Sequence, residues 1–248
     1  MISPERKTSE ALVLASSPYS EDSALITLAG KEGLFSLLAH SIYKPSSPFK
    51  PLLIIGNVVK IDYRAHSTGL NSASSLEVVF DASSALSSYS SSCFLQFLEE
   101  MSLALYRYGD SYPYEEAEEI ISALIAKKDP LSLALLLLGV FYRSLGLKIE
   151  TSSCVLCSRK DEIVSYSLEE GGFLCKSCAE IHNIESKPKE DLYVLKYAFA
   201  PLREEILSKV VPPASGRRVL RDLIQQLESY FDLPPLRSYS LFLDSLVR

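Results

Sequence analysis

Two Cys-x-x-Cys pairs constrain this chain more than any other feature of its sequence. Cys154 and Cys157 form the first pair, Cys175 and Cys178 form the second, and seventeen residues separate them. This spacing is typical of a four-cysteine zinc module, in which two thiolates from each pair close a tetrahedral shell around the ion. Because a closed shell leaves no position for water, the sequence predicts a structural Zn²⁺ and not a catalytic one.

The alternative for these cysteines is a pair of disulfide bonds. Residues 1–5 are polar and lack the hydrophobic segment of a secretion signal, so we expect a cytoplasmic protein. Thiols stay reduced in the cytosol, where paired Cys-x-x-Cys segments are more often metal sites. Cys93 lies in an apolar run and is expected to be a buried, small hydrophobic side chain. His182 follows Cys178 by four residues but is a weaker candidate ligand, because four cysteines already complete the shell.

Composition and charge limit the function classes further. The chain has 248 residues and is 47% hydrophobic, which is ample for a packed core. Its longest uncharged, mostly apolar run, Leu131 to Tyr142, is too short to span a bilayer, which needs about 20 residues. We therefore expect no membrane association. The net charge is −6, so any contact with nucleic acid must rest on a local basic patch.

The first eighty residues read as short strands separated by turn-forming residues. Five apolar runs of strand length occur there, at 11–14, 24–28, 34–38, 52–61 and 76–80. This pattern predicts a small closed barrel of five strands, an OB-fold, with an SH3-like barrel as the nearest alternative.

After Asp81 the apolar residues fall at helical spacing instead. Helices are expected at 86–108, from Pro113 to Lys128, from the capping Asp129 to about 145, at 189–209 with a break at Pro201, at 215–231 and at the end of the chain. The fold class is therefore α+β. The expected domains are a nucleic-acid-binding barrel at 1–80, a helical domain at 81–150 and 187–248, and a zinc module inserted at 151–186.

The zinc module carries its own hairpin signal. Residues 163–168 alternate as a strand does, and 169–172 form a turn that leads into the second cysteine pair. This arrangement is typical of a zinc ribbon. About thirty residues are too few to bury a core of their own, so the metal is expected to hold the module together.

The order of these parts resembles the RecO family of bacterial recombination mediators. Three groups of segments carry the resemblance: 11–14, 19–21 and 30–33 near the start; 154–178, with its Gly-Gly before the second cysteine pair; and 218–220 with 236–238 near the end. Together they span nearly the whole chain.

The resemblance implies a DNA repair and recombination mediator without catalytic chemistry. Such a protein binds single- and double-stranded DNA, anneals complementary strands, and helps to load the recombinase RecA. Its implied partners are RecR and the acidic C-terminal tail of single-strand-binding protein, and it is nucleoid-associated when bound to DNA. One departure concerns the segment 40–50, which is usually basic in the family but here carries only Lys44 and Lys50.

Two surfaces are candidates for DNA contact. In the first, Tyr43, Lys44 and Lys50 combine an aromatic face with charge in one loop, where bases stack and lysines meet phosphates, and Lys31 could add to it. The alternative is a solvated loop whose aromatic side chains close the barrel end. The second surface is a basic patch for DNA or an acidic tail, formed by Arg203, Arg217, Arg218 and Arg221. The alternative is that these arginines are solvated or paired internally.

Two other function classes compete with a DNA-binding protein. A zinc deaminase needs a His-x-Glu segment, a Pro before a Cys-x-x-Cys pair, and a water on the metal. The chain has no His-x-Glu, and neither cysteine pair follows a proline, so we expect no enzyme. The remaining alternative is a zinc-containing adaptor that binds only proteins, which the acidic balance favours.

Overall fold

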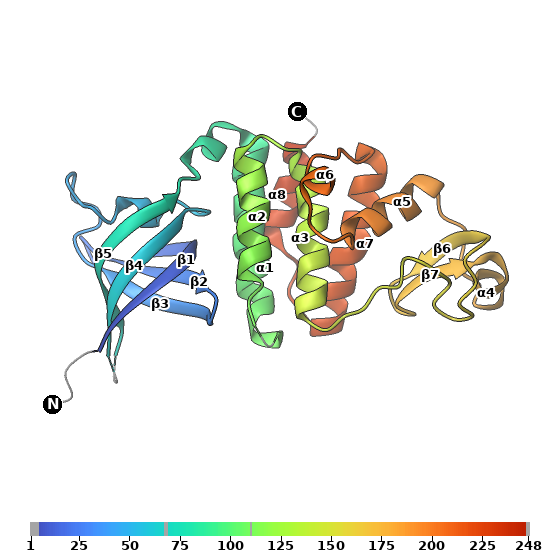
Figure 1. Ribbon diagram of the computed structural model, residues 1–248, viewed down its shortest axis with the longest axis horizontal. Helices are drawn as coiled ribbons and strands as arrows, with labels where there is room; N and C mark the ends of the chain where they lie inside the picture. The colour runs from blue at the N-terminus through green and yellow to red at the C-terminus, as the bar shows by residue number, and fades with distance from the viewer. Residues whose placement is uncertain (1–4, 67–68, 110, 247–248) are drawn as a thin grey trace. The chain divides into compact units, whose positions relative to one another are not determined.

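A computed structural model describes residues 5–66, 69–109 and 111–246 (Figure 1). The chain divides into two compact units, Met1–Ile125 and Ala126–Arg248. The boundary between the units lies inside the helical region expected at 81–150. The domain boundaries expected from the sequence therefore stay predictions. Among the helices of the described ranges, none is long and apolar enough to cross a membrane.

The first unit contains the closed five-stranded barrel that the sequence predicts. Its strands are β1 (Glu5–Pro18), β2 (Ala24–Gly30), β3 (Gly33–Ala39), β4 (Val58–Ala65) and β5 (Asn71–Phe80). They follow the order β1-β2-β3-β5-β4, and the barrel closes through antiparallel β1–β4 pairing and a short parallel contact of β3 with β5. The side chains that alternate inward, such as Val13, Ile26, Leu37 and Ile61, form its core.

Strand β1 is much longer than the apolar run at 11–14 indicates. Residues 11–18 pair with β2, whereas residues 5–12 pair with β4, so only Ala11 and Leu12 have partners on both sides. A register shift between Val13 and Ala15 bends the strand into the barrel. Residues 5–10 are polar and carry no hydrophobic signal, which is why the sequence pattern did not reveal them.

The strand expected at 52–61 is wrong in its first half. Residues Lys50–Leu53 form a 3₁₀ helix, η1, with Pro51 in its first turn, and β4 begins only at Val58. Proline cannot donate to a strand ladder, so this segment does not enter the sheet. Leu52 instead points into the barrel core, where it is fully buried.

Asn57 connects three parts of the barrel at one buried point. Its side-chain amide donates to the carbonyl of Pro51 at 2.9 Å and accepts from the backbone N–H of Ala82 at 2.7 Å. Its own carbonyl accepts from the N–H of Val13 at 2.8 Å. The side chain is 1% exposed, so no water replaces these bonds if they are lost.

Helices follow the barrel within the first unit. The elements are η2 (Ser83–Ser87), α1 (Tyr89–Leu105), η3 (Tyr106–Tyr108) and α2 (Tyr114–Ile125). The Ser88 hydroxyl caps α1 by accepting from the N–H of Ser91. Glu115 and Glu116 lie in the first turn of α2, where the helix dipole favours negative charge. Cys93 is buried in α1, as expected.

The second unit is built around α3 (Pro130–Ser144), whose central residues are buried on all sides. Asp129 caps this helix as predicted, and α5 (Lys189–Ala198) and α7 (Pro213–Phe231) pack against it (Figure 1). The backbone carbonyl of Ala198 lies so close to Gly139 that no side chain fits at this position of α3. Short α6 (Glu204–Leu207) follows the predicted break at Pro201, and α8 (Arg237–Ser245) is the last helix described.

We expect Asn57→Ala to lower the free energy of unfolding by about 2–4 kcal/mol, because it leaves a half-buried carbonyl and a buried N–H without partners. Urea denaturation followed by circular dichroism measures the change. Asn71→Ala is the control, since the Asn71 side chain is half-buried and its two hydrogen bonds are longer, both 3.3 Å. Equal stability losses in the two variants would contradict a special role for Asn57.

Candidate functional site: a four-cysteine cluster and three charged surfaces

The four cysteines that the sequence singles out lie together in the second unit. Their sulfur atoms are all within 4.8 Å of one another, and the Sγ atoms of Cys157 and Cys175 are 3.6 Å apart. Tetrahedral zinc with Zn–S bonds of about 2.3 Å requires sulfurs separated by roughly 3.8 Å. The donor set and its spacing therefore fit one tetrahedral metal ion.

Local backbone structure positions each pair. Cys154 begins a tight turn, in which its carbonyl accepts from the N–H of Ser158 at 2.8 Å and its N–H donates to the carbonyl of Arg159 at 2.7 Å. Cys175 ends β7 (Gly172–Cys175), which pairs with β6 (Ile163–Ser167), and Cys178 lies in the first turn of α4 (Lys176–Ile181). The predicted hairpin with one cysteine pair at each end is thus confirmed.

The electrostatics of the cluster suit a cation. Burial disfavours the thiolate of Cys154, but N–H groups of Cys175, Cys157 and Leu156 donate to its sulfur and lower its pKa to about 6. Hydrogen bonding with Cys157, followed by burial, raises the pKa of Cys178 to about 12. The protein alone therefore stabilises one thiolate but opposes several together, and a divalent cation would supply the missing positive charge.

His182 does not belong to the group of clustered ligand atoms, which consists of the four cysteines. Its Nδ1 lies 3.4 Å from a carboxylate oxygen of Glu170, on the turn between β6 and β7. The weaker expectation that His182 replaces a cysteine therefore finds no support in this geometry.

A polar contact joins the ribbon to the helical part of the same unit. The Tyr166 hydroxyl on β6 donates to Asp222 on α7 at 2.6 Å, and the Lys187 ammonium donates to the same oxygen at 2.9 Å. That ammonium also lies 4.3 Å from the centre of the Tyr166 ring, a cation–π distance. The buried ring, the shared carboxylate and the linker lysine together fix the ribbon against α7.

The arginines expected to form one basic patch have different surroundings. Arg218 makes a bidentate pair with Asp191, with bonds of 2.7 and 2.9 Å, and also donates to Ser215. Arg217 donates to the carbonyl of Leu246 at 2.8 Å, and its Nε is buried without a hydrogen-bond partner among the described residues. Arg203 and Arg221 are exposed. Internal pairing, the alternative reading, therefore holds for Arg218.

The barrel residues expected to contact DNA are also only partly available. Tyr43 is 41% exposed and Lys50 is exposed, but the Phe49 side chain packs against the barrel core. Lys44 lies 3.7 Å from Asp22, and Lys31 forms a 2.8 Å ion pair with Glu115 of α2. The exposed pair with Glu115 raises the pKa of Lys31.

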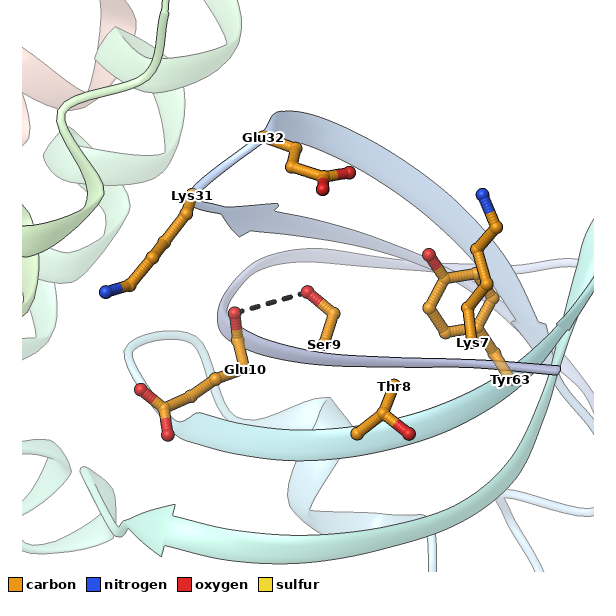
Figure 2. A pocket seen from close by; sticks show the side chains of 7 residues that line it. All are labelled: Lys7, Thr8, Ser9, Glu10, Lys31, Glu32 and Tyr63. Carbon is orange, nitrogen blue, oxygen red and sulfur yellow. Dashed lines mark hydrogen bonds between the residues drawn. The ribbon is translucent and has the colours of Figure 1, made fainter.

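Sequence reasoning missed a second group of barrel residues. Lys7 and Tyr63 lie opposite each other on β1 and β4, and the Tyr63 ring stacks on Phe35 at 5.4 Å. They line a cavity of about 350 Å³ beside the turn between β2 and β3 (Figure 2). The other lining residues are Thr8, Ser9, Glu10, Lys31 and Glu32. Residues 5–10 are polar throughout, so no alternation of apolar and polar side chains signals this strand in the sequence.

Two family models together match most of the chain. The family described as Recombination protein O N terminal matches residues 3–81, and that described as Recombination protein O C terminal matches residues 87–240. A DNA repair protein RecO of Bacillus cereus and one of Bacillus anthracis are each 21% identical over 231 residues, which is 90% of either chain. That of Halalkalibacterium halodurans is 22% identical over 174 residues, 69% of this chain and 68% of the relative.

We expect the Asp191–Arg218 pair to make stability depend on acid pH. Burial alone would raise the pKa of Asp191, but hydrogen bonds from Arg218 and Ser215 outweigh it and hold this pKa below its usual value. A depressed carboxyl pKa stabilises the fold above the unfolded value of about 3.9, and this contribution is lost as the pH falls through the folded pKa.

Asp191→Asn should therefore cost about 1–2 kcal/mol at neutral pH, since Arg218 is half-exposed, and should flatten the loss of stability in acid. Urea unfolding measured at a series of pH values tests this. Asp161→Asn, at an exposed carboxylate 3.8 Å from Arg159, is the control and should retain the wild-type slope. A variant at residue 191 with the wild-type pH profile would refute the assignment.

Proposed function

Because the chain belongs to the RecO family, we propose that it acts in DNA repair by binding single- and double-stranded DNA and annealing complementary strands. The observation that carries the proposal is the five-stranded barrel, closed in the OB order, in a chain that matches the family along both halves. Barrels of this kind commonly bind oligonucleotides. No catalytic step is needed for this role, which rests on binding alone.

The protein is further proposed to load a recombinase onto DNA covered by single-strand-binding protein, together with a RecR-like partner. Exposed Arg203 and Arg221 are the part of the arginine group best able to take an acidic tail peptide, because Arg218 already holds Asp191. Guanidinium groups bind carboxylates in a bidentate manner, which suits such a tail. Such work would take place in the cytoplasm, on the chromosome.

The metal proposed for the cysteine cluster is Zn²⁺ in a structural role. Cys154, Cys157, Cys175 and Cys178 would hold it, and it would supply the positive charge that lets four thiolates coexist. Four sulfur ligands are typical of zinc or iron–sulfur centres, and a single tetrahedral set on two short turns favours zinc. Since the module buries few apolar side chains, metal binding would account for most of its stability.

A protein-only adaptor remains the second candidate function. The observation in its favour is charge: the chain has a net charge of −6, and Lys31, Lys44 and Arg218 each lie beside an acid of the same chain. DNA would have to compete with those acids at each of these positions. For this reason Tyr43 and Lys50 are the loop residues that best support contact with DNA.

We expect fluorescence anisotropy to detect binding of single-stranded DNA at low salt, with affinity falling steeply as salt rises. The slope of log K against log salt should be about −0.7 for each phosphate contacted, so a footprint of three phosphates loses roughly twentyfold between about 50 and 200 mM. An adaptor would show no binding at either salt concentration.

Charge-reversal variants then test which of the two predicted surfaces contacts DNA. Lys44→Glu with Lys50→Glu should weaken DNA binding if the loop carries the contact, and Arg203→Glu with Arg221→Glu should weaken DNA or acidic-peptide binding if the helical unit does. Lys209→Glu, at another exposed lysine of that unit, controls for net charge. If neither double variant differs from this control, both predicted surfaces are excluded.

We expect one zinc ion per chain by elemental analysis, lost in Cys175→Ser. Removing a sulfur ligand breaks the shell, and the module should then become sensitive to limited proteolysis. Cys93→Ser is the matched control, because that buried cysteine belongs to α1 of the other unit and should leave zinc content unchanged. Native protein that folds without metal and resists proteolysis would refute a structural metal.

A further inference from the structure

On the N-terminal side of Ala11, residues 5–10 of β1 no longer pair with β2. They pair with β4 alone and form a ribbon that has two accessible faces. Successive side chains on a strand point to opposite faces, and Figure 2 shows Lys7 and Thr8 on opposite sides of β1. Lys7 and Tyr63 therefore belong to one face of the ribbon, although Thr8 and Glu10 of the other face also line part of the cavity. Arg6, two residues before Thr8, belongs to the other face, which we call the outer face.

Two of the three rows across the outer face are balanced in charge or satisfied by hydrogen bonds. In one row Asp62 accepts from the Thr8 hydroxyl at 2.6 Å and from the Ser75 hydroxyl at 2.7 Å. In the next row Lys60 lies in register between Glu10 on β1 and Glu77 on β5. Neither row therefore has an excess of positive charge that would attract an anion.

The third row is different, because two cations lie directly opposite each other. Arg6 on β1 is in register with Arg64 on β4, and Ser72 of β5 lies on the far side of Arg64. Both arginines are exposed, and neither forms an ion pair with any residue in the described ranges. Asp62, in the neighbouring row, accepts hydrogen bonds from Thr8 and Ser75, and the charge of Arg6 adds a smaller contribution to the lowering of its pKa.

Like charges directly opposite in an antiparallel pair destabilise a sheet. Strand partners start from Cα atoms about 5 Å apart, so two guanidinium groups can converge on a single anion from this row. The Ser72 hydroxyl, which lies 3.5 Å from Nε2 of exposed His66, can add a neutral donor. A bound anion would turn the repulsion between the arginines into attraction.

The cavity beside Lys7 and Tyr63 is a poorer anion site. Its charged lining residues are Lys7 and Lys31 against Glu10 and Glu32. The two lysines have acidic neighbours, Glu5 at 3.8 Å and Glu115 at 2.8 Å, so the cavity offers no excess of positive charge. The outer row instead presents two exposed arginines that form no ion pair within the described ranges.

We propose that Arg6, Arg64 and Ser72 form a phosphate-binding row on the outer face of the barrel, which takes the sugar–phosphate backbone of DNA. The inference rests on the proposed function, since the anion it commits to is a DNA phosphodiester. Arginine is well suited to this ligand because its planar fork matches phosphate geometry, and backbone contacts of this kind position DNA without reading its sequence.

The double variant Arg6→Gln, Arg64→Gln tests the row in the full-length protein. Anisotropy with a labelled oligothymidine at several salt concentrations should show a loss of affinity on the order of tenfold at low salt, and a salt slope smaller in magnitude by about 0.7, because the two guanidinium groups meet the same phosphate. The matching duplex, measured in parallel, should lose affinity as well, because both forms carry the same backbone.

Lys60→Gln is the matched control, since it removes a cation from the same face of β4 where two glutamates already balance it. This variant should bind DNA like the wild type. The urea midpoint of the arginine double variant should equal or exceed that of the wild type, because its substitutions relieve repulsion. A purely structural role for the arginines would lower that midpoint.

The possible outcomes distinguish a failure of the phosphate-binding row from a failure of the proposed function. If the wild type binds no DNA at low salt, the proposed function fails. If the wild type binds and the double variant binds equally well, or loses affinity with an unchanged salt slope or a lowered urea midpoint, the phosphate row is refuted. Loss of binding to an acidic peptide, with DNA binding unchanged, would also overturn it, because the ligand would then be a protein.

Discussion

Pairing of one strand along both of its edges is the constraint on which the barrel and its surfaces depend. At Ala11 and Leu12 the first strand has partners in both β2 and β4, and this short overlap closes the sheet. Closure removes the free strand edges that an open sheet would expose. Where the overlap ends, β1 and β4 continue as a ribbon, so the same strand that seals the hydrophobic core also presents charged side chains on two faces.

The second unit obeys a different constraint, because its ribbon is too small to bury a core. Its buried cluster consists of Cys154, Leu174, Cys175 and Ala179, so the sulfur ligands are themselves much of the interior. Two devices compensate for this: a cluster of donors shaped for a tetrahedral ion, and the contact of Tyr166 and Lys187 with Asp222. Both serve position and stability.

In this protein, a charged side chain can be assigned a role only when the residues that it contacts are known. Arg218 resembled a ligand-binding residue in the sequence, yet it holds buried Asp191, and Lys31 is paired with Glu115, eighty-four positions along the chain. Conversely, Arg6 and Arg64 attracted no interest in the sequence because nothing in it places them together. The strand register makes them neighbours, and two exposed cations in one row, with no ion pair among the described residues, distinguish a candidate ligand site from ordinary surface charge.

The sequence by itself determined the four-cysteine set, the barrel class and the helix that Asp129 and Pro130 begin, because each depends on chemistry local to a few residues. Ligand spacing, short apolar runs and a capping side chain all act over neighbouring positions. Only the tertiary structure decided that residues 5–10 are strand, that Leu52 fills the barrel end from a 3₁₀ turn, and which cations are neutralised. Those outcomes depend on contacts between distant segments, where cross-strand pairing and burial outweigh the local preferences of the chain.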